Sequence, residues 1–168
     1  MITLGTGLGG GIIIDKRVYA GFNDAGGELG HMVIVADGWP CTCGRKGCWE
    51  AYASATGLVK LTKEIMGVEE AGGRTAFIAM RNGDPKGKEA VDKYMFYLAC
   101  GLGSIINIFQ PEVLCIGGGI SHEGELLIEL LTEALKGEVY TRDVPQTTIR
   151  LARLGNDAGI IGAAMLGK

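Results

Sequence analysis

Three cysteines and one histidine that lie close together in the sequence constrain this chain more than any other feature. The run Cys41-Thr-Cys43-Gly-Arg-Lys-Gly-Cys48 begins ten residues after His31. Zinc prefers four nitrogen and sulfur ligands in a tetrahedron, and three cysteines with one histidine form a common closed set. Two glycines inside the run suit a loop that folds back on a metal, because glycine adopts positive φ at little cost. We therefore predict a structural zinc site in a loop at about residues 31–48.

A disulfide is the competing interpretation of this cluster. Cys41 and Cys43 are too close in sequence to pair without strain, and pairing either of them with Cys48 leaves an odd thiol. The other two of the five cysteines, Cys100 and Cys115, lie in apolar surroundings. An odd number of thiols is typical of a reducing compartment, so we expect a cytoplasmic protein.

The composition bounds what the chain can do. Its 168 residues are 47% hydrophobic and 21% charged, which suits one domain, or one lobe of a larger one, with a sizeable core. The net charge is −3 and no basic stripe is present, which argues against nucleic acid as a partner. The most apolar stretch, residues 96–109, is shorter than the ~20 residues that cross a bilayer, and no signal peptide pattern opens the chain. We expect no membrane partner.

Hydrophobic periodicity and turn residues predict strands first and alternating strands and helices afterwards. Strands are expected at residues 2–4, 11–14, 17–20, 32–35, 113–116 and 148–151. Helices are expected between a Thr56 cap and Gly67, and at residues 85–109, 123–135 and 158–166. A three-strand antiparallel meander followed by strand–helix–strand–helix is an α/β architecture.

Most of the first glycine loop lies between the first two predicted strands. It contains Gly5, Thr6, Gly7 and Gly9. Bare backbone N–H groups bind phosphate, and the Thr6 hydroxyl adds a donor. The loop lacks the Gly-Lys-Ser/Thr ending of a Walker loop, and a strand rather than a helix follows it. A glycine-rich hairpin without any ligand explains the pattern equally well.

A second glycine loop follows the predicted buried strand at residues 113–116. It contains Gly117, Gly118, Gly119 and Ser121. The α/β proteins bind ligands at the carboxyl ends of strands, and three glycines would let a flat adenine or a ribose lie against backbone. Tight strand–helix packing is the alternative, although it requires only one glycine.

Two carboxylates flank the predicted zinc loop. A metal that holds His31 and Cys48 would also bring Glu28 and Glu50 together. Ionised carboxylates accept hydrogen bonds from vicinal hydroxyls, and a zinc-bound histidine keeps one ring N–H for an oxygen partner. These groups suit a sugar. The alternative is that Glu28 is a solvated loop charge and Glu50 a first-turn helix charge that the helix dipole favours.

Taken together, these motifs resemble those of the ROK family (repressors, open reading frames and kinases), and within it the bacterial glucokinases. The resemblance runs from Met1 to Lys168 in the family's order. The segments that carry it are Leu-Gly-Thr-Gly-Leu-Gly-Gly-Gly-Ile from Leu4, Gly-Glu-Leu-Gly-His31, the cysteine run with Trp-Glu50, Asn107 to Gly119, and Gly-Asn-Asp-Ala-Gly-Ile-Ile-Gly-Ala-Ala from Gly155.

The resemblance implies the actin-like ATPase (ribonuclease H-like) fold of sugar kinases. Residues 5–11 would be the second phosphate motif, with Thr6 near the γ-phosphate of Mg-ATP, and residues 117–121 the adenosine motif. Three residues would hold sugar hydroxyls, namely Glu28, His31 and Glu50. Four would bind zinc, namely His31, Cys41, Cys43 and Cys48. A homodimer is also implied.

One departure from the family pattern is large. Family kinases carry an N-terminal lobe with an Asp-x-Gly-Gly-Thr phosphate motif and an Asn-Asp pair that supplies the catalytic base. The phosphate motif does not occur here, and Asp15, Asp24 and Asp37 do not match the base by motif. We therefore expect residues 1–168 to be a single C-terminal lobe of an enzyme that phosphorylates the 6-hydroxyl of glucose with ATP. The alternatives are a sugar-sensing transcriptional regulator and a non-catalytic module that binds zinc and sugar.

Overall fold

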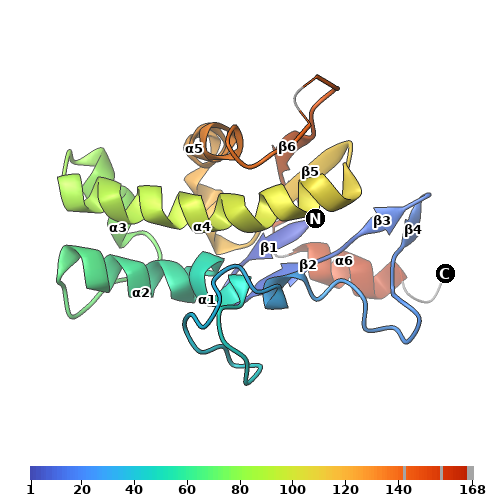
Figure 1. The fold of residues 1–168 in the computed structure, drawn as a ribbon, viewed down its shortest axis with the longest axis horizontal. Coiled ribbons are helices and arrows are strands. Elements are labelled where there is room, and N and C mark those ends of the chain that lie inside the picture. Colours follow the sequence, from blue (N-terminus) through green and yellow to red (C-terminus); the bar gives the residue numbers. More distant parts are fainter. Residues whose placement is uncertain (142, 156, 166–168) are drawn as a thin grey trace.

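A four-stranded mixed sheet positions the loops of interest (Figure 1). The computed structural model describes residues 1–141, 143–155 and 157–165. The strands are β1 (Ile2–Leu4), β2 (Leu8–Gly10), β5 (Val113–Gly117) and β6 (Thr148–Leu151), in the spatial order β2-β1-β5-β6. β2 runs antiparallel to β1, whereas β1, β5 and β6 are parallel. The predicted α/β class is confirmed.

The predicted meander is split into two hairpins. β2 begins at Leu8, inside the stretch we expected to be loop, because the turn after β1 is tight enough for pairing to resume at once. A separate two-stranded sheet joins β3 (Ile13–Ile14) to β4 (Arg17–Val18). Its two-residue turn, Asp15-Lys16, has φ of 52° and 63°, which suits the twist of a hairpin.

The strand expected at residues 32–35 does not form. Among the described residues this segment makes one isolated bridge, between Val33 and Cys48. The backbone N–H groups of Ile34 and Val35 both donate to the Gly47 carbonyl, at 2.9 Å and 3.3 Å. The segment is therefore committed to the cysteine loop and is not available to a sheet.

Six α-helices and two 3₁₀-helices complete the described part of the chain. The α-helices are α1 (Trp49–Ala53), α2 (Ala55–Met66), α3 (Thr75–Arg81), α4 (Pro85–Phe109), α5 (Glu125–Leu135) and α6 (Asp157–Met165), and the 3₁₀-helices are η1 (Leu29–His31) and η2 (Gly119–Glu123). The short helices α1 and α3 were not predicted. None of these helices is both long and apolar enough to cross a bilayer.

The starts of α2 and α5 differ from the predicted ones because the residues just before each helix determine where it begins. Ser54, not Thr56, caps α2, and its hydroxyl accepts a hydrogen bond from the Gly57 N–H at 3.1 Å. α5 begins at Glu125, because Gly124 has φ +69° and separates it from η2. The predicted last residue of the final helix, Leu166, lies outside the described residues.

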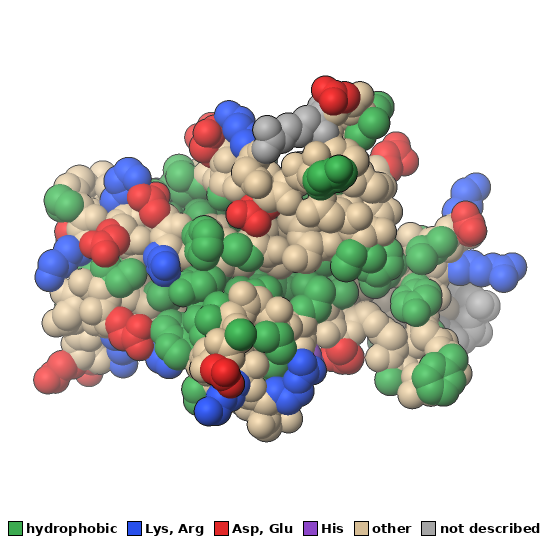
Figure 2. All heavy atoms as spheres, in the orientation of Figure 1, with side chains coloured by type: hydrophobic (Ala, Val, Ile, Leu, Met, Phe, Trp, Pro, Cys, Tyr) green, Lys and Arg blue, Asp and Glu red, His purple; other side chains and the backbone are tan. Residues whose placement is uncertain are grey.

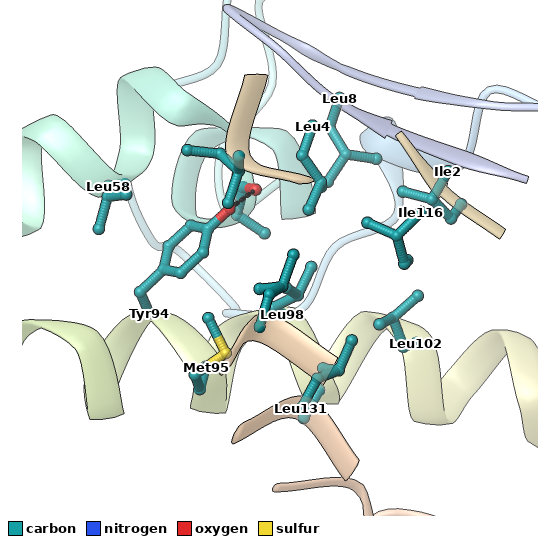
Figure 3. Packing of buried hydrophobic residues seen from close by; sticks show 14 of the residues in the cluster. Ile2, Leu4, Leu8, Leu58, Tyr94, Met95, Leu98, Leu102, Ile116 and Leu131 are labelled. Carbon is teal, nitrogen blue, oxygen red and sulfur yellow. Dashed lines mark hydrogen bonds between the residues drawn. The ribbon is translucent and has the colours of Figure 1, made fainter. Parts of the chain in front are cut away.

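The long helix α4 organises the core. Asp84 caps it, accepting the Lys86 N–H at 2.8 Å, and Pro85 occupies its first turn. Its buried face lies between α2, α5 and the sheet (Figure 1). Figure 3 shows Leu98 and Leu102 of α4 facing the side chains of β1 and β5. The buried Tyr94 hydroxyl donates to the Ala53 carbonyl at 2.8 Å, which fixes α1 over the same core.

Candidate functional site

The sheet brings the two glycine loops to one edge. β1 and β5 are parallel neighbours with Thr3 opposite Gly117, so the loops that follow them leave the sheet side by side. Gly118 has φ +86°, and a Cβ there would lie 2.5 Å from the backbone carbonyl of Leu4. Only glycine fits this close approach, and it places the second loop directly against the end of β1.

The first loop is anchored to the start of α2. Gly5 N–H donates to the Gly7 carbonyl at 3.0 Å, which closes the turn. The Gly5 carbonyl accepts the Ala55 N–H at 2.8 Å, and the Thr6 carbonyl accepts the Thr56 hydroxyl at 2.7 Å. The Thr6 side chain remains exposed at the tip of this turn.

Packing accounts for part of the glycine content of this region. A Cβ on Gly7 would lie 2.5 Å from Glu50 Oε2. Gly9 lies within β2 opposite Thr3, and a Cβ there would be 2.8 Å from Thr3 Oγ1. The structural explanation for the glycines therefore applies at positions 7 and 9, whereas a Cβ on Gly5 would be 3.9 Å from the Gly7 carbonyl oxygen, an ordinary contact distance.

The second loop is closed by its own serine. The Ser121 hydroxyl donates to the Gly118 carbonyl at 2.7 Å, and the Ser121 N–H donates to the same oxygen at 3.0 Å. No atom of the described structure lies within 4 Å of a Cβ built on Gly119. The loop thus presents bare backbone toward open space at its centre.

The predicted zinc ligands converge. The ligand atoms of His31, Cys41, Cys43 and Cys48 all lie within 4.8 Å of one another. Cys43 Sγ is 3.6 Å from Cys48 Sγ, and Cys41 Sγ is 3.7 Å from His31 Nδ1. A tetrahedron with Zn–S bonds of about 2.3 Å has edges of about 3.8 Å. The separations fit a metal, and all three cysteines are free rather than disulfide-bonded.

The backbone fixes this cluster before any metal is considered. Cys41 N–H donates to the Arg45 carbonyl at 2.8 Å, which folds the loop into a small hairpin. Gly47 has φ +76°, and a Cβ there would lie 1.7 Å from the Val35 carbonyl oxygen, so only glycine fits. Burial raises the pKa of the Cys48 thiol to about 12, so a metal that binds the thiolate must displace a proton.

Glu50 connects the cysteine loop to the first glycine loop. It lies in the first turn of α1, and its Oε2 accepts the Leu8 N–H at 2.8 Å. Its Oε1 is 3.4 Å from the Thr42 hydroxyl and 3.8 Å from Cys41 Sγ. From the sequence we expected Glu50 to be a sugar-binding carboxylate or a first-turn helix charge. Its hydrogen bond to the first residue of β2 was not predicted.

Glu28 and His31 lie at the two ends of η1. Gly30 packs against β2 so tightly that a Cβ would lie 2.3 Å from the Leu8 carbonyl oxygen. Glu28 is exposed at the helix N-terminus, and its side chain makes no capping bond. The structure therefore places both the Glu28–His31 segment and Glu50 against β2, with the Glu28 carboxylate open to a ligand.

A buried carboxylate was missed by the sequence analysis. Glu123, at the end of η2, forms ion pairs with Arg74 and Arg81 at 3.1 Å and 2.5 Å. Its side chain is only 2% exposed. The arginines lie 49 and 42 residues earlier in the chain, so no local pattern could have identified the cluster.

The sheet, its paired loops and the solved structures it resembles define the class: an α/β domain with the actin-like ATPase fold of sugar kinases. The ROK family model matches residues 1–168, and the chain belongs to the ROK family, as its motifs indicated.

Three relatives show the range of this likeness. The chain is 35% identical to a glucokinase of Halalkalibacterium halodurans, covering 100% of this chain and 55% of the relative. The structure of a ROK family glucokinase from Streptomyces griseus in complex with glucose and AMPPNP matches with a TM-score of 0.88 and 35% identity, over 98% of this chain and 58% of that one. A ROK family transcriptional regulator, a homologue of the E. coli MLC protein, matches with a TM-score of 0.79 and 30% identity, over 97% and 43%. The chain thus spans about half the length of the relatives it matches.

We predict that the Glu50→Ala variant loses stability, because it leaves the part-buried Leu8 N–H without its acceptor. The expected loss in the free energy of unfolding is about 1–3 kcal/mol, measured by urea denaturation. Amide exchange at Leu8 should accelerate, whereas the matched Glu129→Ala variant on the exposed side of α5 should leave both quantities unchanged. Unchanged Leu8 exchange in Glu50→Ala would show that the bond is absent in solution.

Proposed function

We propose that this chain is the lobe of an ATP-dependent hexose kinase that holds the nucleotide and one side of the sugar, and that the whole enzyme phosphorylates the 6-hydroxyl of glucose. One observation carries the proposal. Two glycine loops leave the same sheet edge, and the first of them is bonded through Leu8 to Glu50, a carboxylate beside the metal-type loop. A phosphate site and a polyol site are therefore adjacent.

In this proposal each part binds and orients. The backbone N–H groups of Thr6 and Gly7, with the Thr6 hydroxyl, contact the terminal phosphates of Mg-ATP, and the Gly117–Ser121 loop receives the adenosine. The carboxylates of Glu28 and Glu50 accept bonds from sugar hydroxyls, and the ring N–H of His31 donates to one. Phosphoryl transfer depends chiefly on such positioning and on charge stabilisation, and Mg²⁺ would offset the negative charge of the phosphates when bound.

The catalytic base is proposed to lie outside these 168 residues. The chain covers 55% of the Halalkalibacterium glucokinase, so relatives carry substantial further sequence. Exposed hydrophobic side chains support this proposal, since a further domain could cover them. Figure 2 shows hydrophobic side chains on the β3–β4 hairpin, where Ile13 and Val18 are exposed, and α6 is apolar but has no buried residue.

Zinc is proposed to have a structural role. The converging ligands His31, Cys41, Cys43 and Cys48 fit it, and the metal would fix the His31 ring and the loop that contacts Glu50. Thiol ligands without a disulfide also suit the reducing cytoplasm that we propose for the enzyme.

We predict about one zinc per chain after dialysis, measured by plasma mass spectrometry. The Cys43→Ser variant should lose most of the metal, because it removes one of four ligands, while Cys100→Ser should retain it, since Cys100 lies outside the cluster. Retention should fall as the pH is lowered, because protons compete for the thiolates. A clearly substoichiometric zinc content in the parent chain would contradict the structural role.

The kinase proposal predicts glucose-dependent ADP release once the remaining part of the relative from Halalkalibacterium is fused in front of this chain. The Glu28→Gln substitution in that fusion should lower kcat/KM for glucose about 10- to 100-fold, because a charged acceptor for a hydroxyl is lost. The Glu129→Gln variant is the matched control, since that carboxylate is exposed on α5. The measurement is a coupled ADP assay, with NMR to identify the phosphorylated position.

Two other outcomes separate the alternatives. Hexose binding without ATP binding would favour the sugar-sensing regulator, a class represented among the structural matches, or a module that only binds zinc and sugar. Turnover with another hexose in place of glucose would keep the kinase and correct the substrate. A homodimer is part of the proposal, and its test is the molar mass in solution.

A further inference from the structure

The α2–α3 connection lies beside the second glycine loop. A Cβ built on Gly73 would be 3.9 Å from Ile120 Cδ1, inside the loop that receives adenosine in the proposed function. Arg74 follows at once as the N-cap residue of α3. The backbone therefore places a guanidinium next to η2, although Arg74 and Gly117 are 43 positions apart in the sequence.

Glu123 forms a hydrogen bond with only one nitrogen of this guanidinium, Nε. Its buried carboxylate accepts Arg74 Nε at 3.1 Å through Oε1, and Arg81 Nη2 at 2.5 Å through Oε2. Bonding through Nε leaves both terminal nitrogens of Arg74 free of hydrogen bonds within the described chain, and its side chain is 67% exposed. The terminal part of the group is thus oriented but open.

The charges in this cluster do not balance. One carboxylate offsets only one of the two guanidinium charges, and a buried charge pair is retained at a desolvation cost. A pairing that served only to attach α3 to η2 would require one arginine. Arg81 supplies it, because it contributes the shorter of the two contacts and is the less exposed partner. Arg74 is therefore available for a ligand.

We propose that Arg74 is a nucleotide-binding residue, with its guanidinium packed on the face of the adenine and Glu123 as its positioning residue. The inference rests on the proposed function and deepens it. A planar guanidinium stacks on aromatic rings, and a base is flat on both faces. The opposite face of the base would meet the bare backbone at Gly119, while the phosphates extend toward the Gly5 turn at the end of β1.

The test compares displacement of a fluorescent ADP analogue by ADP and by adenosine, using this chain. The Arg74→Ala variant should weaken both competitors by the same factor, about 5- to 100-fold, because stacking does not involve phosphate. Arg74→Lys should show most of this loss, since an ammonium keeps the charge but lacks the planar group. Arg81→Ala is the matched control, because it removes the other bond to the buried Glu123 carboxylate; it should weaken binding clearly less than Arg74→Ala does, since it disturbs the attachment of α3 but leaves the stacking group in place. Thermal melts establish that each variant is folded.

Each contrary outcome has a distinct meaning. A loss confined to ADP that grows at low salt would place Arg74 on phosphate and overturn the stacking. Equal losses in the two alanine variants would show that only the scaffold was disturbed, and wild-type affinity in Arg74→Ala would also overturn the inference. If the unmodified chain binds no ADP, the nucleotide site of the proposed function fails and this inference fails with it.

Discussion

The hydrogen bond from the Leu8 N–H to Glu50 is the interaction on which the site depends. It joins the first residue of β2 to the first turn of α1, and the other oxygen of the same carboxylate faces Cys41 and Thr42. Gly7 must lack a side chain for this contact to exist. One carboxylate therefore sets the distance between the glycine turn at the sheet edge and the cysteine loop.

A second constraint acts on the nucleotide side. Gly118 lies so close to Leu4 that the loop after β5 cannot move independently of β1. Beyond this contact, Glu123 ties η2 to α3 through two arginines. The loops that we assign to phosphate and adenosine are thus braced by the sheet on one side and by an ion cluster on the other. Such bracing is what a site requires when catalysis depends mainly on positioning.

The sequence analysis succeeded for features that depend on residues close together in the chain. The convergence of His31 with Cys41, Cys43 and Cys48, the capped helix α4 and the buried strand β5 each follow from residues near one another in the chain, and the structure contains these three features, while the zinc itself stays a prediction. Family membership was recognised from motifs of the same local kind. The short helices α1 and α3 were missed because each is at most seven residues long and its stability comes from packing on α4.

Long-range pairing explains the other differences. The sequence at residues 32–35 has strand character, but its N–H groups bond to Gly47, which no pattern within the segment indicates. The role of Glu123 depends on partners more than 40 residues away, and the bond between Leu8 and Glu50 spans 42 residues. These contacts become visible only when the fold is known.

The central claim is that nucleotide and hexose bind to adjacent sites on this chain. The most direct measurement is an NMR titration of the labelled chain with AMPPNP and then with glucose, following backbone amides. We expect AMPPNP to shift Gly5, Thr6 and Gly118–Ser121, and glucose to shift the amides around Glu28, His31 and Glu50, with Leu8 responding to both. Shifts confined to the apolar cavity that Ile106 of α4, Leu135 of α5 and Ile149 of β6 line, or no shifts at these loops at millimolar ligand, would contradict the claim.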